Sequence, residues 1–505
     1  MDVITMIDLL YPNDSHFASS AKISHELLRL DDAFLYIATD IKSTHLFLDI
    51  ICETATSANA DTILYRQAIL QDFYSSPRFL TELKCRFTLL SQLTADYNDF
   101  SGRIVDSGSP SSSKGSDSRL HTTATVMNMS AEYLEKALLL LSEIKSVFEN
   151  NPFVSDGLRS LYASVSKCGG TEEFYKLCDL CHSLSEYSAE KNEIDLSVEL
   201  NEYAKMISFS LLDIHPEKNT SDRKNSFWNF GGKQKTDNKT GTPSTISQYD
   251  SNAIIAAALK SVSSIFGSAI KFISKSFAEI EKALTFYETA LKYISYLEES
   301  KINYIYPEIL SNGKSEIFQL RDLYLLASSL DKKAVVPNDF IYGSAEASDS
   351  PQYGLLIRGE NGSGKTVYLR SIASAYALAM SGLPITAQSA KITPKNIWLL
   401  FASSEKSLAS SAADAGRFEE EVRDFAEILN KVTPDSLIIL NEFFQTTSYD
   451  EGAEGLYYIL RFLSDRGINW ITVTHMHRLF DLFSNSPQVK KAFCDADTHK
   501  IIEIS

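Results

Sequence analysis

The segment that most constrains the fold of this chain is the octapeptide GENGSGKT at residues 359–366. It fits the pattern G-x-x-x-x-G-K-[ST], in which glycines let backbone N–H groups curl around phosphate oxygens without a Cβ atom in the way. Residues 354–358 predict a short buried strand before it, and residues 366–380, which contain neither Pro nor Gly, predict a helix after it. A phosphate bound there would lie at a helix N-terminus, where free amides and the helix dipole favour an anion. We therefore predict a nucleotide-binding loop in preference to a chance match in a glycine-containing loop.

The whole loop is expected to contact ATP. Lys365 is predicted to reach the β- and γ-phosphates as a catalytic group, and the Thr366 hydroxyl is predicted to ligate Mg²⁺. The predicted cofactor-binding residues are Gly359, Glu360, Asn361, Gly362, Ser363, Gly364, Lys365 and Thr366.

Polar residues follow two later apolar runs. Residues 436–440 predict a strand that continues into Asn441 and Glu442, and the next predicted strand ends in His475. Glu442 is placed to polarise the attacking water, and His475 to sense the γ-phosphate at the edge where open α/β sheets bind ligands. Asn441 stands where such a segment normally carries Asp, so we expect a second metal ligand without charge, weaker Mg²⁺ binding and slower turnover. The alternatives are a buried strand ending in an Asn-Glu turn and a purely structural histidine.

Composition describes an ordinary globular chain. Its 505 residues are 44% hydrophobic and 22% charged, which allows two or three domains. The N-terminus lacks a basic region and a cleavage site, and Lys260, Lys271 and Lys275 interrupt the most apolar stretch, so we expect a cytoplasmic protein without a membrane span. The net charge of −17 argues against a general nucleic-acid coat protein, although a local basic patch could still bind DNA.

The cysteines do not indicate a disulfide scaffold, since the chain has only six. The run from Cys178 to His182, CDLCH, formally matches a haem-attachment pattern and half of a zinc site. With no second pair at zinc spacing, we interpret Cys178 and Cys181 as core thiols on a helix.

The chain is organised by two polar tracts, at residues 106–114 and 215–249, which read as loops or linkers. Residues 251–306 contain no proline and one glycine, and a helix of roughly 50 residues would be about 75 Å long, as suits an arm or lever. After residue 332, short apolar strands alternate with helices, which predicts a mostly parallel sheet covered on both faces. The predicted strands are residues 354–357, 397–401, 436–440, 469–473 and 500–504.

The C-terminal half resembles the ATPase domain of MutS-type DNA mismatch-repair proteins. The resemblance covers about residues 335–478 and rests on motifs that occur in the family's order. They are Val336-Pro337-Asn338-Asp339, Asn361, Tyr368-Leu369-Arg370, residues 382–387 (GLPITA), Phe418 with Glu421, Thr447-Ser448, Gly452 and Thr474-His475. Upstream, residues 7–10 and 63–67 are similar to the start of the family's helical core.

The resemblance implies a multidomain α + α/β protein, in which a long all-helical core and lever region precedes a P-loop, ABC-like ATPase domain. We expect a helical core at 1–211, a basic, aromatic, clamp-like loop at 212–250, a lever at 251–333 and the ATPase domain at 334–505. It also implies a homodimer with composite ATP sites. The family's signature serine is replaced near Gly416-Arg417, and Ser403, Ser404 or Arg417 could substitute for it. The mismatch-recognition and connector domains, the helix-turn-helix tail and the nuclease domain are expected to be absent.

DNA contacts are predicted in the second polar tract, which takes the place of the family's clamp. It holds six basic and three acidic residues, a local net charge of +3, interleaved with Phe227, Trp228 and Phe230. Cations suit phosphates and aromatic rings suit bases, although a solvated linker has the same composition. The DNA-binding candidates are Lys218, Arg223, Lys224, Trp228, Lys233 and Lys235.

Our first hypothesis is an ATPase that couples nucleotide state to DNA binding in repair or recombination, without mismatch recognition. The alternative is a nucleotide-gated scaffold with weak ATPase activity that binds protein partners and not DNA. A small-molecule P-loop kinase is disfavoured, because such an enzyme does not need a long helical arm.

Overall fold

The computed structural model describes residues 8–12, 25–38, 40–107, 116–168, 172–187, 192–200, 206–216, 248–343, 351–401, 414–444 and 449–504. The chain forms two compact units. The helical unit contains residues 82–151 and 160–281, and the sheet unit contains residues 8–81, 152–159 and 282–505. Each unit is described by itself.

Long helices build the helical unit. They are α5 (Pro77–Ser107), α6 (Ser116–Glu149), α7 (Asp156–Cys168), α8 (Glu172–Ser185) and the first part of α9 (Gln248–Glu299). Leu134, Leu141 and Ile144 of α6 are buried and belong to the core of this unit. A bond between the buried hydroxyl groups of Ser130 and Ser263, 3.0 Å apart, joins α6 to α9.

A β-hairpin, β1 (Asn192–Leu200) with β2 (Met206–Pro216), interrupts the region that was expected to be all helical. The strands are antiparallel and pair Asn192 with Pro216 at one end. The signal for β1 is the strict alternation of apolar and polar residues in NEIDLSVEL, which has the period of a strand and not of a helix. The hairpin was not predicted.

The two thiols of the CDLCH run lie on α8, as predicted. Cys181 is fully buried, and this burial raises the pKa of its thiol to about 12. Among the residues that the structure describes, no group of three or more His, Cys, Asp or Glu side chains could hold a metal ion. The interpretation as a core thiol therefore holds for Cys181, while Cys178 is half-buried.

The predicted long helix is confirmed as α9, which ends earlier than residue 306. Lys301 takes a left-handed backbone conformation with φ +53°, and the Ile302 N–H donates to the Leu297 carbonyl at 2.8 Å. This pattern closes a helix C-terminus. Residues Ile255–Glu299 are long and apolar enough to cross a membrane by length and composition alone. In the sheet unit, however, α9 buries Phe286 and Tyr293 completely, as a core helix does.

The sheet unit is built on a six-stranded sheet with the order β12-β11-β6-β10-β9-β8. Its strands are β6 (Gly354–Gly359), β8 (Asn396–Phe401), β9 (Ser436–Asn441), β10 (Asn469–Val473), β11 (Val489–Cys494) and β12 (Ile501–Ile504). All neighbours pair in parallel except β11 and β12, which form an antiparallel hairpin at one edge. The five predicted strands are confirmed, and β11 was missed.

A smaller four-stranded sheet has the order β3-β7-β4-β5. Its strands are β3 (Glu308–Ile309), β4 (Ser315–Leu320), β5 (Asn338–Tyr342) and β7 (Ser389–Ile392). The other helices of the sheet unit are α1 (His25–Leu28), α2 (Leu30–Phe34), α3 (Ile41–Ala55), α4 (Ala60–Ser75), α10 (Leu323–Ser328), the 3₁₀ turn η1 (Lys332–Ala334), α11 (Lys365–Met380), α12 (Asp414–Leu429), α13 (Tyr449–Asp465) and α14 (His477–Leu482).

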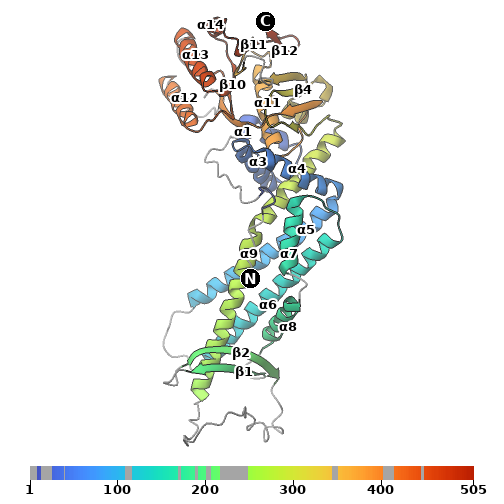
Figure 1. Cartoon of the computed structure of the whole chain (residues 1–505), viewed down its shortest axis with the longest axis vertical. Coiled ribbons are helices and arrows are strands. Elements are labelled where there is room, and N and C mark those ends of the chain that lie inside the picture. The colour runs from blue at the N-terminus through green and yellow to red at the C-terminus, as the bar shows by residue number, and fades with distance from the viewer. Residues whose placement is uncertain are drawn as a thin grey trace, which may run out of the picture. The chain divides into compact units, whose positions relative to one another are not determined.

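Helices cover both faces of the larger sheet. α12 and α13 lie on one side of β10 and α11 lies on the other (Figure 1). Leu456 and Leu460 of α13 pack with Trp470 of β10 in one apolar cluster. α11 is buried along almost its whole length, because α1, α3 and α4 contact it in addition to the sheet. This arrangement fixes the start of α11 against the carboxyl ends of β6, β9 and β10.

Candidate nucleotide-binding site

The glycine-rich loop connects β6 to α11, as the sequence predicts. α11 begins at Lys365 and is capped by Gly364, whose φ is +104°, while Gly362 has φ +81°. Side chains with a Cβ are strained in this region, so both positions favour glycine. At Gly359, an added Cβ would lie 2.7 Å from the Cys494 carbonyl oxygen of β11. The loop thus needs its glycines for conformation and for close packing.

The Lys365 side chain folds back into the loop. Its Nζ donates to the carbonyl oxygens of Gly359 at 2.9 Å and Glu360 at 2.6 Å. Burial lowers the pKa of Lys365 below the ordinary value for lysine, and the negative charge of Glu442 opposes that shift. The loop therefore carries a cation that is held by its own carbonyl groups.

The two predicted metal ligands are in contact. The Thr366 hydroxyl donates to Oδ1 of Asn441 at 3.3 Å, and Asn441, at the end of β9, is only 1% exposed. Both offer uncharged oxygen atoms, and oxygen is the ligand type that Mg²⁺ takes from proteins beside waters and phosphate oxygens. The residues fit Mg²⁺ in kind, without a carboxylate on β9 to neutralise its charge.

The two predicted catalytic side chains past β9 and β10 are also in contact. His475 Nε2 lies 2.9 Å from Glu442 Oε1, and the side chains are 26% and 30% exposed. Glu442 has φ +53°, which is unusual for a residue with a Cβ, and its N–H donates to the Val473 carbonyl at 3.0 Å. Local strain of this kind concentrates at functional sites, where the surrounding structure holds it.

A helix residue supports this turn from behind. Glu421 of α12 is buried, and its Oε2 accepts the Phe444 N–H at 3.1 Å. Phe444 itself has φ +64° and stacks on Phe443 with ring centroids 4.3 Å apart. Only the family resemblance pointed to Glu421, and its contact with Phe444 gives it a specific structural role.

A cavity of about 500 Å³ opens beside the loop. Its lining includes Arg358, Glu360, His475, His477, Phe480 and Phe493. The Arg358 guanidinium lies over the Phe480 ring, 5.3 Å from its centroid. Apart from Glu360 and His475, these lining residues were not predicted, and no local motif marks them.

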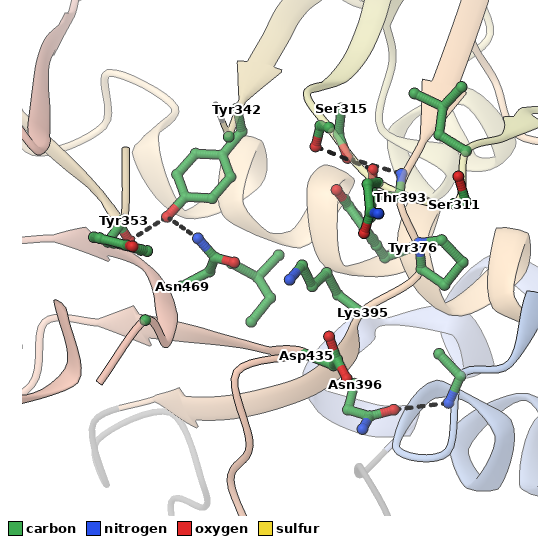
Figure 2. Close-up of a pocket in the computed structure, with 18 of the residues that line it drawn as sticks. Ser311, Ser315, Tyr342, Tyr353, Tyr376, Thr393, Lys395, Asn396, Asp435 and Asn469 are labelled. Carbon is green, nitrogen blue, oxygen red and sulfur yellow. Dashed lines mark hydrogen bonds between the residues drawn. The ribbon is translucent and has the colours of Figure 1, made fainter. Parts of the chain in front are cut away.

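A second cavity, of about 520 Å³, lies at the opposite edge of the sheet, where β8, β9 and β10 begin (Figure 2). Tyr342 donates its hydroxyl to the Tyr353 carbonyl there, and the Lys395 Nζ donates to the Pro434 carbonyl at 3.1 Å. Burial lowers the pKa of Lys395. None of the sequence-predicted site residues lines this cavity.

Several predictions fall outside the described residues. They are Ser403, Ser404, Thr447, Ser448 and the DNA-binding candidates Lys218, Arg223, Lys224, Trp228, Lys233 and Lys235. The side chains of Arg417 and Phe418 in α12 are also outside the described part of the chain.

The glycine-rich loop lies between a parallel strand and a buried helix. Five predicted side chains gather at the carboxyl ends of the strands: Lys365, Thr366, Asn441, Glu442 and His475. This arrangement defines a P-loop nucleotide-binding domain. The sequence comparisons then place it more narrowly. Residues 355–503 match the family model of MutS domain V, and residues 58–300 match that of the MutS2 N-terminal domain. The chain belongs to the MutS family.

Curated relatives agree with this assignment. The chain is 29% identical over 191 residues to a protein described as DNA mismatch repair protein MutS from Desulfosudis oleivorans, a match that covers 37% of this chain and 21% of the relative. It is 28% identical over 202 residues to one described as Endonuclease MutS2 from an Anaeromyxobacter species, covering 39% of this chain and 24% of the relative. The matches thus span about a quarter or less of each relative's length.

Proposed function

We propose that this protein binds and hydrolyses ATP and couples its nucleotide state to DNA binding, in DNA repair or recombination and without mismatch recognition. The observation that carries the proposal is the 2.9 Å contact between His475 and Glu442 at the mouth of the glycine-rich loop. A phosphate-binding loop alone implies only binding, whereas a carboxylate next to it supplies a base for water.

The reaction is the transfer of the γ-phosphoryl group from ATP to water, giving ADP and phosphate. Lys365 and the loop amides stabilise the negative charge that develops on the transferred group. Mg²⁺, held by Thr366 and Asn441 when bound, supplies further charge neutralisation. Glu442 accepts the proton of the attacking water as the bond from the γ-phosphorus to the bridging oxygen breaks. His475, as an Nε2–H donor, keeps the Glu442 carboxylate oriented and responds to the γ-phosphate.

Asn441 sets the expected rate. An amide oxygen at the end of β9 can accept from a metal-bound water but contributes no negative charge, so Mg²⁺ is held more weakly than by a carboxylate. We infer slow hydrolysis, a state in which bound ATP persists long enough to hold one conformation of the protein.

The proposal extends to partners. Two relatives carry descriptions as a DNA mismatch repair protein and an endonuclease, which supports DNA as the ligand. We further propose a homodimer with composite ATP sites as the working form. We also propose that the tract 212–250, which includes the end of β2 and the start of α9, acts as the DNA clamp. It would lie in the chain between the core at 1–211, helical except for the β1–β2 hairpin, and the lever at 251–333, with the ATPase domain at 334–505. The protein would act in the cytoplasm and not at a membrane.

A second candidate is a nucleotide-gated scaffold that hydrolyses ATP poorly and recruits proteins instead of DNA. The uncharged Asn441 and the net charge of −17 favour it. Both candidates share the nucleotide site and differ in what the rest of the chain binds.

The test uses the whole 505-residue chain in two steps. Calorimetry with ATP and magnesium, followed by steady-state hydrolysis, should show binding and turnover that fall by about 100-fold or more in Lys365→Ala. Binding to duplex and branched DNA at several salt concentrations, with and without ATP, then separates the candidates, because phosphate contacts weaken steeply with salt. Absence of ATP binding rejects both functions, and ATP binding without DNA binding leaves the scaffold.

A further inference from the structure

One buried carbonyl group of the glycine-rich loop receives two side-chain hydrogen bonds from the C-terminal hairpin. The carbonyl oxygen of Ser363 accepts from the Cys494 thiol at 3.1 Å and from Nδ1 of His499 at 2.8 Å. Ser363 is fully buried, so its carbonyl depends on protein donors. The donors come from the end of β11 and from the turn before β12, more than 130 residues further along the chain.

The turn that carries His499 is itself held on both sides. The His499 N–H donates to the Asp495 carbonyl at 2.9 Å, and the Asp495 N–H donates to the Lys500 carbonyl at 2.9 Å. From β5, the Asn338 amide group donates to the His499 carbonyl at 3.1 Å and accepts the Ile501 N–H at 2.9 Å. His499 has φ +54°, a conformation that persists only where the surroundings impose it. The imidazole ring therefore meets Ser363 from a fixed position.

The geometry of a peptide unit gives this contact a consequence. In a planar trans peptide the C=O and the following N–H point in opposite directions, so fixing the Ser363 carbonyl also fixes the Gly364 N–H. Amides of this loop type cradle the phosphates. Gly364, with φ +104°, has no Cβ to hinder rotation of the Ser363–Gly364 peptide, so that peptide can turn unless something holds it. A rotated peptide would turn a carbonyl oxygen toward the phosphates and repel them.

We propose that Cys494 and His499 are positioning residues that lock the Ser363–Gly364 peptide, so that the Gly364 N–H is ready to receive a phosphate oxygen. This inference rests on the proposed nucleotide-binding function and adds two residues to it that touch neither phosphate nor metal. The chemistry of both donors suits the role. Burial raises the pKa of the Cys494 thiol, which keeps the S–H available to donate. A neutral histidine can place its proton on Nδ1.

The test exploits the shape of histidine substitutes. An asparagine places its amide N–H₂ near the position of Nδ1, whereas a glutamine places it near Nε2. Both remove the ring, so their difference reports the donor and not the packing. We would measure the Kd of ATP and of ADP, each with magnesium, by calorimetry on the His499→Asn and His499→Gln variants of the whole 505-residue chain. Thermal unfolding would be followed in parallel, and His45→Gln on the exposed surface of α3 serves as the matched control.

We expect His499→Gln to weaken ATP and ADP binding by about three- to tenfold, the range of one net hydrogen bond, and His499→Asn to recover most of that loss. Cys494→Ser, which keeps an O–H donor, should bind better than Cys494→Ala. Equal affinities for the Asn and Gln variants, or a loss that follows only the unfolding temperature, would overturn the lock. Failure of the parent protein itself to bind ATP would instead remove the proposed function.

Discussion

Nε2 of His475 lies 2.9 Å from Oε1 of Glu442, although the two residues follow different strands, β10 and β9. The contact exists because β9 and β10 are parallel neighbours, which brings their carboxyl ends to the same edge of the sheet. Val473 completes the arrangement by accepting the Glu442 N–H. The carboxylate is thus held by its backbone and by its side chain.

Replacing this carboxylate should separate binding from hydrolysis. Glu442→Gln keeps a hydrogen-bond acceptor for His475 but removes the base, so steady-state ATP hydrolysis should fall by about 100-fold or more while ATP affinity stays near the parent value. Glu454→Gln, on the exposed side of α13, is the matched control. Hydrolysis by Glu442→Gln at the parent rate would show that this carboxylate is not the base.

A carboxylate at the end of β9 should strengthen the metal site. Asn441→Asp keeps an acceptor for the Thr366 hydroxyl and adds a negative charge at a position that is only 1% exposed, which is costly to bury until Mg²⁺ binds. We expect the magnesium concentration for half-maximal hydrolysis to fall by about tenfold, or about 1.4 kcal/mol. The melting temperature should drop without magnesium and recover with magnesium and ATP. An unchanged magnesium dependence would place residue 441 away from the metal.

Gly354 should tolerate no side chain. An added Cβ would lie 2.2 Å from Cζ2 of Trp470, which is fully buried on the neighbouring strand and has no room to move. Overpacking of this kind costs about 1–3 kcal/mol, so Gly354→Ala should unfold at lower urea concentration. Gly455→Ala on α13 is the opposite case, since nothing lies within 4 Å of the added Cβ. Its free energy of unfolding should rise by up to about 1 kcal/mol, because alanine favours a helix more than glycine does. Equal stability of the two variants would contradict this packing.

Asp322 should make stability depend on pH. Its buried carboxylate caps α10 by accepting the Leu325 N–H at 2.8 Å. Burial raises the pKa of Asp322 above the ordinary 3.8, and the cap bond and the charge of Arg370 oppose the shift. The folded state therefore binds more protons than the unfolded state in the interval above 3.8, and the parent loses stability as pH rises through that interval.

Asp322→Asn keeps a hydrogen-bond acceptor for the α10 cap and removes the loss of stability that ionisation of the buried carboxyl group causes. The free energy of unfolding of the variant, relative to the parent, should therefore increase between about pH 3.5 and pH 7 in urea titrations. Asp331→Asn, which alters the exposed cap of η1, is the control. A difference that shrinks with rising pH would reverse the assignment of burial as the dominant cause.

Local patterns sufficed for much of this architecture. The strand, loop and helix around residues 354–380 are contiguous in sequence, so their geometry follows from glycines and apolar runs alone. The same holds for α9. β11 was not predicted because Lys490 and Lys491 interrupt its apolar pattern. In the structure Lys490 forms an ion pair with Glu503 across the hairpin, at 3.3 Å. That partner is visible only once the strands are paired.

The supporting contacts of the site could not be predicted for a related reason. Cys494 and His499 meet Ser363 across 131 and 136 positions of sequence, and no local pattern encodes such a distance. Glu421 likewise reaches Phe444 from another element. The predicted chemical residues fall in short sequence motifs, whereas the residues that position them come from segments that are distant in sequence and adjacent only in the fold.

The burial of α11 has a practical consequence for handling the protein. The predicted nucleotide-binding residues begin at position 359. The helix that follows them, α11, packs against α1, α3 and α4, which come from the first 75 residues. A fragment starting near residue 334 would leave an alanine-rich apolar flank of that helix in water. Such a fragment should precipitate on expression, and co-expressing it with a piece that supplies residues 8–81 should restore its solubility.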